Sequence, residues 1–127
     1  MDKLELLETI AKGEDSFTEF KKDIESSDEI VAEICAFANS KGGRLILGVS
    51  DEGEIVGLKR DWSDKISSWI TTKLDPPLED ITIQKFLIEE KLIIVVEIPI
   101  GSQKPYALLR KGTRLSLIHI SEPTRRS

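Results

Sequence analysis

The segment from Glu33 to Gly57 places a helix, a glycine turn, a buried strand and a second turn within 25 residues. Its helix is rich in small residues and runs into the turn NSKGG at 39–43, after which a strand of branched apolar residues follows directly. The second turn is acidic and contains Gly53, a residue suited to a positive φ. Because a strand connects the two turns, their polar groups are held at fixed positions, where binding or catalytic sites are often built.

The pattern of apolar residues predicts an α+β fold. Apolar residues recur at helical spacing in three segments, which predicts helices at about 2–11, 28–41 and 61–74. Ser26 and Glu29 have the spacing of a capping box at the start of the second helix. Alternating and β-branched runs predict a short strand at 16–22 and hairpins at 44–58 and 81–98. We therefore expect a mixed or antiparallel sheet of about five to six strands packed with two to three helices.

Length and composition fit one globular domain. The chain has 127 residues, of which 39% are hydrophobic and 32% are charged. Its formal net charge of −5 argues against a protein that coats nucleic acid through general positive charge, but it is compatible with a local basic patch. No apolar run approaches the roughly 20 residues of a membrane-spanning helix. The single cysteine, Cys35, lies among apolar residues, and we expect a cytoplasmic protein without a membrane partner.

Residues 115–127 resemble the in-frame translation of a sequencing-library adaptor. The run LSLIHISEPTR is of the kind left at the ends of truncated reads, although LSLIHI also has the composition of a genuine strand. We expect the native domain to occupy residues 1–114 and the natural chain to continue beyond Arg114. The single histidine, His119, then drops out as a catalytic or metal-binding candidate.

The turn at 39–43 carries glycines and cations but has the wrong order for a phosphate-binding loop. Such a loop precedes a helix and faces its positive N-terminal end, whereas these glycines follow a helix C-terminus. Cations near the turns are candidates for contacts with nucleic-acid phosphates, and plain solvated lysines are the alternative. The candidate nucleic-acid-binding residues are Lys21, Lys22, Asn39, Lys41 and Arg44, and the structural turn residues are Gly42, Gly43, Gly48, Gly53 and Gly57.

Three carboxylates form a second candidate site. Glu14 and Glu19 lie five residues apart around a predicted strand start, and Asp51 lies in the acidic turn. Carboxylate oxygens suit Mg²⁺ or Mn²⁺, and such sites support phosphodiester cleavage. The chain has 23 acidic residues, so an accidental, solvated acidic surface is the alternative. A Ser-His or Cys-His mechanism has no base once His119 is set aside.

Several of these motifs together resemble the Schlafen AlbA-like DNA-binding domain family. The similarity rests on E-x4-E-F-K at 14–21, ICAFANSKGG at 34–43, LILGV-x-D-x-G-x-IVG at 45–57 and KPY at 104–106. It covers nearly all of residues 10–114. The resemblance implies an α+β module, often N-terminal in bacterial transcriptional regulators that continue into ATPase-like, ATP-binding or winged-helix regions.

The resemblance implies functions from different classes. The first is a nucleic-acid-binding module without a cofactor, for which DNA is favoured over RNA and a homodimer is considered. The second is a Schlafen-type ribonuclease in which Glu14, Glu19 and Asp51 hold Mg²⁺ or Mn²⁺. The family's third carboxylate lies in a turn that reads GVDD, whereas this chain has GVSD, so Ser50 replaces the first aspartate. A protein-interaction domain is a third alternative, and we favour the first function.

Overall fold

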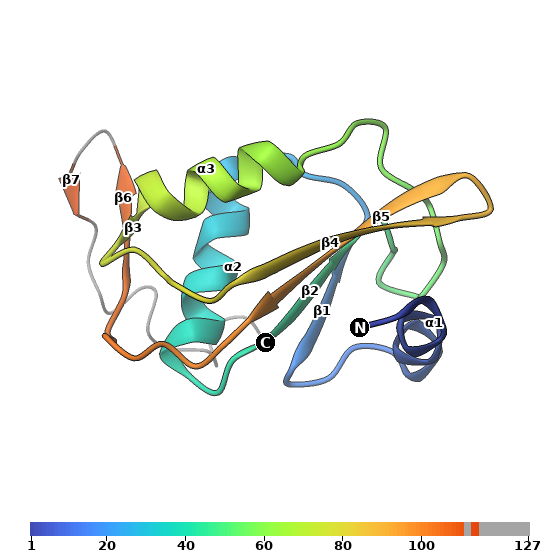
Figure 1. Cartoon of the computed structure of the whole chain (residues 1–127), viewed down its shortest axis with the longest axis horizontal. Helices are drawn as coiled ribbons and strands as arrows, with labels where there is room; N and C mark the ends of the chain where they lie inside the picture. The colour runs from blue at the N-terminus through green and yellow to red at the C-terminus, as the bar shows by residue number, and fades with distance from the viewer. Residues whose placement is uncertain (111–112, 115–127) are drawn as a thin grey trace.

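A four-stranded sheet with helices on both faces forms the centre of the structure, a computed structural model that describes residues 1–110 and 113–114 (Figure 1). The strand order is β1-β2-β5-β4, with β1 parallel to β2 and the other pairs antiparallel. Its strands are β1 (Thr18–Lys21), β2 (Gly43–Leu47), β4 (Thr82–Ile88) and β5 (Lys91–Ile98). A smaller sheet joins β3 (Leu74–Asp75), β6 (Ala107–Arg110) and β7 (Thr113–Arg114). The predicted α+β class is confirmed.

Two separate cores lie on the two faces of the four-stranded sheet. The helices are α1 (Lys3–Lys12), α2 (Ser27–Asn39) and α3 (Ser63–Lys73). Leu45 and Leu47 of β2 belong to the core that includes α2 and α3. Ile46, between them, belongs to the core that includes α1, because successive side chains of a strand point to opposite faces. Figure 1 accordingly shows α1 on one side of the sheet and α2 and α3 on the other.

The three predicted helices are confirmed, and their ends are set by local hydrogen bonds. At the start of α2, Ser26 Oγ accepts a hydrogen bond from the backbone N–H of Glu29 at 3.4 Å, as the capping box predicts. The carboxylate of Glu29, which a full capping box would direct back to Ser26, instead binds Lys21. The helix ends at Asn39 rather than at residue 41, because the backbone N–H of Gly42 bonds back to the carbonyl of Phe37 at 2.8 Å.

Gly42 and Gly43 fold the end of α2 back onto the start of β2. Gly42 has a φ of 76°, and a Cβ atom there would lie 2.7 Å from the carbonyl oxygen of Ile98. A Cβ atom at Gly43 would lie 2.5 Å from the ring of Phe37. A side chain at either position would force the backbones apart, so this turn needs glycine for both conformation and space.

The predicted hairpin at 81–98 is confirmed as β4 and β5, but the return strand predicted at 55–58 does not form. After β2 the chain makes isolated bridges, Val49 with Ile55 and Leu58 with Leu92. The physical reason is that β2 already has a neighbour on each edge, β1 and β5, so neither edge can accept a return strand. The single larger sheet that we expected is therefore divided into a four-stranded sheet and a separate three-stranded one.

Candidate functional site

An acidic hollow of about 400 Å³ lies at the carboxyl ends of β1 and β2. The two strands are parallel, so the segments that follow them leave the sheet at the same edge. The charged residues that line the hollow are Glu19, Lys21, Lys22, Asp23, Glu25, Glu29, Asp51 and Glu52. Six of these eight are carboxylates, so an anion enters the hollow only if a cation accompanies it.

The structure brings two of the three predicted metal ligands to this hollow. Glu19 in β1 and Asp51 after β2 both line it. Glu14 is held at the neighbouring backbone, where its Oε2 accepts a hydrogen bond from the N–H of Phe20 at 2.8 Å. Among residues 1–110 and 113–114, no three His, Cys, Asp or Glu side chains gather in a group that could hold a metal ion. The oxygen donors of Glu19 and Asp51 fit Mg²⁺ or Mn²⁺ by type, but a third ligand would have to come from a rearranged side chain or from water.

Ser50 closes the turn that carries Asp51. Its backbone N–H donates to the carbonyl of Glu54 at 2.9 Å, and its hydroxyl accepts from the backbone N–H of Glu54 at 3.1 Å. An aspartate carboxylate accepts the same kind of local hydrogen bond, so serine preserves the turn while removing one negative charge. The carboxylates that this turn contributes to the hollow are those of Asp51 and Glu52.

Lys21 links β1 to α2. Its Nζ lies 2.8 Å from Glu29 Oε1 and 3.4 Å from Glu33 Oε2. Burial is the largest single influence on the Lys21 pKa and lowers it, but the hydrogen bonds and charges of the two glutamates together raise this pKa above its usual value. Lys21 therefore stays protonated, and two carboxylates already compensate its charge. Lys22, the next predicted contact, is exposed at the hollow instead.

Two other predicted cations lie at the opposite end of β2, together with an aromatic residue that the sequence reasoning did not select. Lys41 is exposed and Arg44 is half-buried, and neither forms an ion pair within the described part of the chain. The carbonyl of Phe17 accepts a hydrogen bond from the backbone N–H of Arg44 at 2.7 Å, and the Phe17 side chain is 45% exposed. Phe17 and Arg44 line an open groove of about 430 Å³, which Asp80 and Glu97 also line.

Asn39 is engaged by the backbone of Tyr106. Its Nδ2 donates to the Tyr106 carbonyl at 3.1 Å, and its Oδ1 accepts from the Tyr106 N–H at 2.7 Å. The same side chain also lies 3.7 Å from Cys35 Sγ. Asn39 therefore holds the end of α2 against the segment that enters β6. The asparagine of the FAN motif therefore has a structural role, because both the nitrogen and the oxygen of its side-chain amide form hydrogen bonds.

Comparison with known proteins establishes the family. The description "Schlafen, AlbA_2" matches residues 14–121, which is most of the chain. The chain belongs to the Schlafen AlbA_2 family. A solved structure, the DIP2311 protein from Corynebacterium diphtheriae, is 19% identical, with a TM-score of 0.61 over 83% of this chain. The match covers 26% of the DIP2311 chain, so this chain spans about a quarter of that protein's length. No curated protein matches the chain significantly.

The Schlafen AlbA_2 match begins at Glu14, the first residue of E-x4-E-F-K, and extends past the domain boundary that we predicted at Arg114. The suspected adaptor remnant at 115–127, with His119, lies outside the described residues, so that boundary stays a prediction. No helix in the described ranges is long and apolar enough to cross a bilayer.

A group of aromatic and basic residues in this AlbA_2 chain lies outside the residues that the sequence predicts as sites. Trp62 and Trp69 lie seven residues apart, and their rings pack with centroids 5.9 Å apart. The guanidinium of Arg60 lies 4.7 Å from the Trp62 ring centroid. Basic residues flank Trp62 in the sequence at 59–65, but helix spacing alone gave no reason to connect them with the two tryptophans.

Proposed function

We propose that this chain is a nucleic-acid-binding module, with DNA favoured over RNA. The observation that supports it best is the exposed ring of Phe17 beside Arg44, two groups that are free to stack on a base and contact a phosphate. Lys41, exposed in the same glycine turn, adds a second cation without an ion pair in the described residues. The expected association of AlbA-like domains with nucleic acid supports the same function.

Salt-dependent binding tests this proposal. A fluorescein-labelled single-stranded or duplex DNA is titrated with the full chain, and anisotropy is followed between about 50 and 200 mM salt. The variant Lys41→Ala/Arg44→Ala removes two phosphate contacts, so the slope of log K against log salt should fall by about 1.4 for single strands and 1.8 for duplex. The matched control Lys3→Ala/Lys12→Ala removes the same charge from exposed positions of α1 and should bind like the wild type. Binding that ignores salt, or no binding at low salt, contradicts the proposal.

The wider context of the module is a bacterial regulator that is longer than this domain. The DIP2311 chain, of which the matched part is only 26%, is consistent with such an arrangement. A winged-helix or ATPase-like partner domain would place the module in transcriptional regulation. Expressing the complete gene that encodes this module and testing whether its product binds ATP and DNA together distinguishes this context. A cytoplasmic location and a homodimer stay predictions.

A metal-dependent ribonuclease is the second candidate function. It is favoured by one observation, that Glu19 and Asp51 both line the same hollow. A bound Mg²⁺ or Mn²⁺ would supply Lewis-acid chemistry there, with these two carboxylates holding it and Glu14 supporting the backbone beside Glu19.

Cleavage of a structured RNA with and without Mn²⁺ tests the ribonuclease. Glu19→Gln should abolish the Mn²⁺-dependent cleavage, because an amide is a poor substitute for a carboxylate ligand. Glu8→Gln, on the exposed side of α1, is the matched control and should cleave normally. Cleavage that survives in purified Glu19→Gln protein would come from a contaminating nuclease and would remove the enzyme from consideration.

A further inference from the structure

Three exposed cations gather where the chain enters α3. Lys59, Arg60 and Lys65 are exposed, and none forms an ion pair within the described residues. The chain as a whole has a net charge of −5, so a group of uncompensated cations stands out from the rest of its surface. Trp62 and Trp69, the two tryptophans of the chain, lie in the same region.

A lysine from β4 reduces the negative charge of this region. Lys85 Nζ lies 2.8 Å from Asp61 Oδ2, and the hydroxyl of Ser63 donates to Asp61 Oδ1 at 2.6 Å. The hydrogen bonds from Lys85 and then Ser63 hold the pKa of Asp61 well below its usual range, and Asp61 in turn raises the pKa of Lys85. Both groups are exposed, so the pair adds little stability. The pair instead changes the surface charge. Lys85 compensates the charge of Asp61, and Asp64 is the other carboxylate within 59–65.

Arg60 lies over the ring of Trp62, which in turn packs against Trp69. Its guanidinium lies 4.7 Å from the Trp62 ring centroid, and Trp62 lies 5.9 Å from Trp69 with the rings tilted by 43°. Both tryptophans pack against the core under α2 and α3. A guanidinium stacked on a fixed ring loses less conformational freedom on binding, and its planar fork matches two oxygens of a phosphate.

The chemistry of the surface favours a nucleic acid over a membrane. Segment 59–73, which the structure describes completely, exposes no large apolar side chain. The exposed large apolar residues lie elsewhere, at Leu4, Leu7, Phe17, Val56, Leu87 and Ile100. Stable binding to a lipid surface normally needs apolar side chains that enter the bilayer. A fixed guanidinium flanked by lysines instead suits the regularly spaced phosphates of a nucleic-acid backbone.

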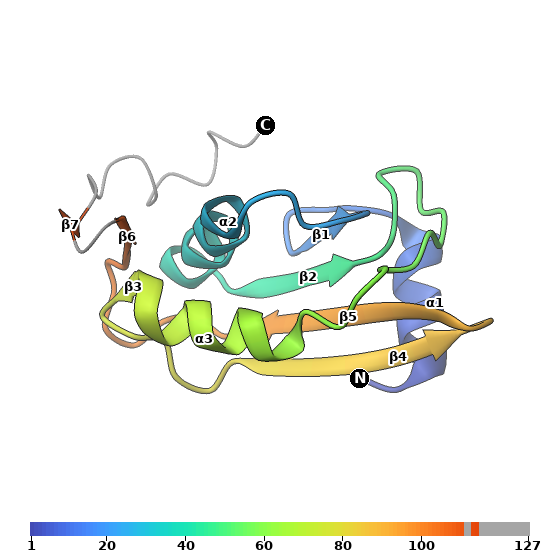
Figure 2. The ribbon, with the colours of Figure 1, turned by 90° about the horizontal axis from the view of Figure 1, so that it is seen from above.

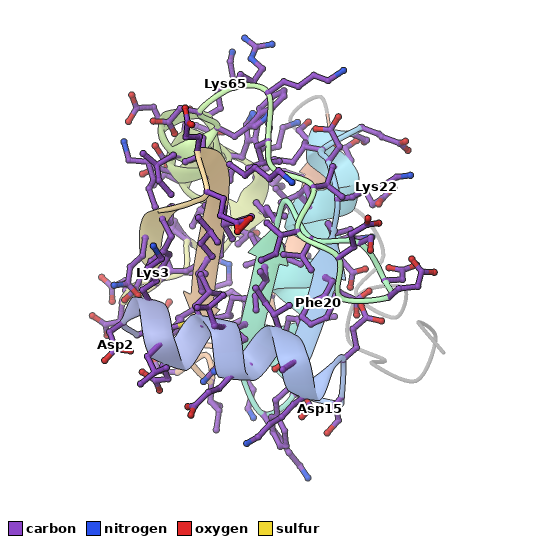
Figure 3. All side chains as sticks on the ribbon, turned by 90° about the vertical axis from the view of Figure 1, so that its right-hand side faces the viewer. Asp2, Lys3, Asp15, Phe20, Lys22 and Lys65 are labelled. Atoms are coloured by element: carbon purple, nitrogen blue, oxygen red, sulfur yellow. The ribbon has the colours of Figure 1, made fainter. Side chains whose placement is uncertain are left out.

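We propose that Lys59, Arg60 and Lys65 form a second contact surface that binds the phosphate backbone of a nucleic acid. The proposal rests on the nucleic-acid-binding function above and adds a surface separate from Arg44. Figure 2 shows the start of α3 and the carboxyl end of β2 directed toward the same end of the molecule, whereas Arg44 lies at the beginning of β2. In Figure 3, Lys65 and Lys22 both lie toward the upper end of the molecule. The surface is therefore at the same end of the molecule as the acidic hollow and away from Arg44, so the two contact regions can be mutated independently.

Anisotropy titrations of labelled duplex DNA with the full chain test the surface. Lys59→Ala/Arg60→Ala/Lys65→Ala should weaken binding at least about tenfold and lower the slope of log K against log salt by about 2.7, the value for three lost phosphate contacts. Lys59→Gln/Lys65→Gln leaves the Arg60–Trp62 contact intact and should show about two-thirds of that slope change. Arg60→Lys keeps the charge but loses the planar fork, and should weaken binding with a nearly unchanged slope. Lys3→Ala/Lys12→Ala is the charge-matched control for the double-glutamine variant, because each removes two positive charges.

Intrinsic fluorescence adds a local readout, because both tryptophans lie at the proposed surface. Unlabelled DNA should change the tryptophan emission of the wild type and of Lys41→Ala/Arg44→Ala, but not of the triple variant.

Each alternative result has a defined meaning. If the wild type binds DNA and both the triple and the double-glutamine variants bind equally well, the surface is wrong and the proposed function stands. If the folded wild type does not bind any nucleic acid at low salt, both proposals fail. If the triple variant keeps DNA binding but loses binding to phosphatidylserine vesicles, the surface recognises lipid phosphates and the proposal is overturned.

Discussion

At the scale of single residues, Trp62 combines a packing role with an unmet hydrogen bond. Its ring contacts both Arg60 and Trp69, yet its Nε1–H is buried without an acceptor among the described residues. An unpaired buried donor costs about 1–3 kcal/mol, because the group has lost its water without gaining a partner. Trp62 also occupies the N-cap position of α3 and makes no side-chain cap hydrogen bond. Its aromatic surface therefore accounts for its contribution to stability.

Two substitutions of Trp62 distinguish the stability contribution of its ring from the cost of its unpaired Nε1–H. Trp62→Phe keeps an aromatic ring and removes the unpaired N–H, so the free energy of unfolding should stay within about 1 kcal/mol of the wild type. Trp62→Ala removes the packing and should lower it by roughly 2–3 kcal/mol. Urea unfolding followed by far-UV circular dichroism measures both. If Trp62→Phe lowered the free energy of unfolding as much as Trp62→Ala does, the Nε1–H would have a hydrogen-bond partner.

Cys35 should be inert in the folded protein. Its side chain is fully buried, and burial raises the pKa of its thiol to about 12, with a smaller opposing effect from Asn39. The thiolate is the reactive form, so at pH 8 the native protein should react with a thiol reagent only through unfolding. The rate of reaction with dithionitrobenzoate should therefore rise by orders of magnitude in denaturing urea. A fast reaction in native buffer would show that α2 opens locally.

At the scale of elements, the parts that the sequence predicts well are those decided by near neighbours. The start of α2 follows from Ser26 three residues before Glu29, and its end follows from the glycine turn. The missing return strand depends on β5, which lies more than forty residues after β2 and occupies its free edge. The pairing of Lys21 with Glu33 likewise depends on how α2 packs beside β1. Such contacts between distant segments leave no local pattern, which is why Lys21 was predicted as a phosphate contact.

The glycine turn after α2 can be tested against a second glycine that also has a positive φ. Gly42 and Gly13 have φ values of 76° and 89°, so alanine is strained at either position. At Gly13 an added Cβ has no atom within 4 Å, whereas at Gly42 it meets the Ile98 carbonyl at 2.7 Å. Gly42→Ala should therefore destabilise the protein by at least about 1 kcal/mol more than Gly13→Ala. If thermal or urea unfolding showed the same loss of stability in both variants, the close approach of Gly42 to Ile98 would be unimportant.

At the scale of the whole molecule, the sheet connects two cores that share no helix. Phe20, Ile46 and Val95 belong to the core with α1, which crosses in front of the strands in Figure 3. The tryptophans pack on the opposite face, with α2 and α3. The same strands supply side chains to both cores, so loss of packing on one face should weaken the other. The candidate residues sit at the strand ends of this sheet, and their geometry depends on both cores together.

Leu6 and Leu4 of α1 provide the test of this coupling. Leu6 is fully buried against the sheet and Leu4 is 67% exposed, so Leu6→Ala should cost roughly 3 kcal/mol and Leu4→Ala less than about 0.5 kcal/mol. Both tryptophans are remote from α1, so their fluorescence reports unfolding of the opposite core. If the two cores unfold as one cooperative unit, Leu6→Ala should shift the tryptophan-detected urea midpoint as far as the midpoint detected by circular dichroism. A tryptophan transition that stays at the wild-type midpoint while the dichroism shifts would show that α1 detaches by itself, leaving the sheet held by α2 and α3.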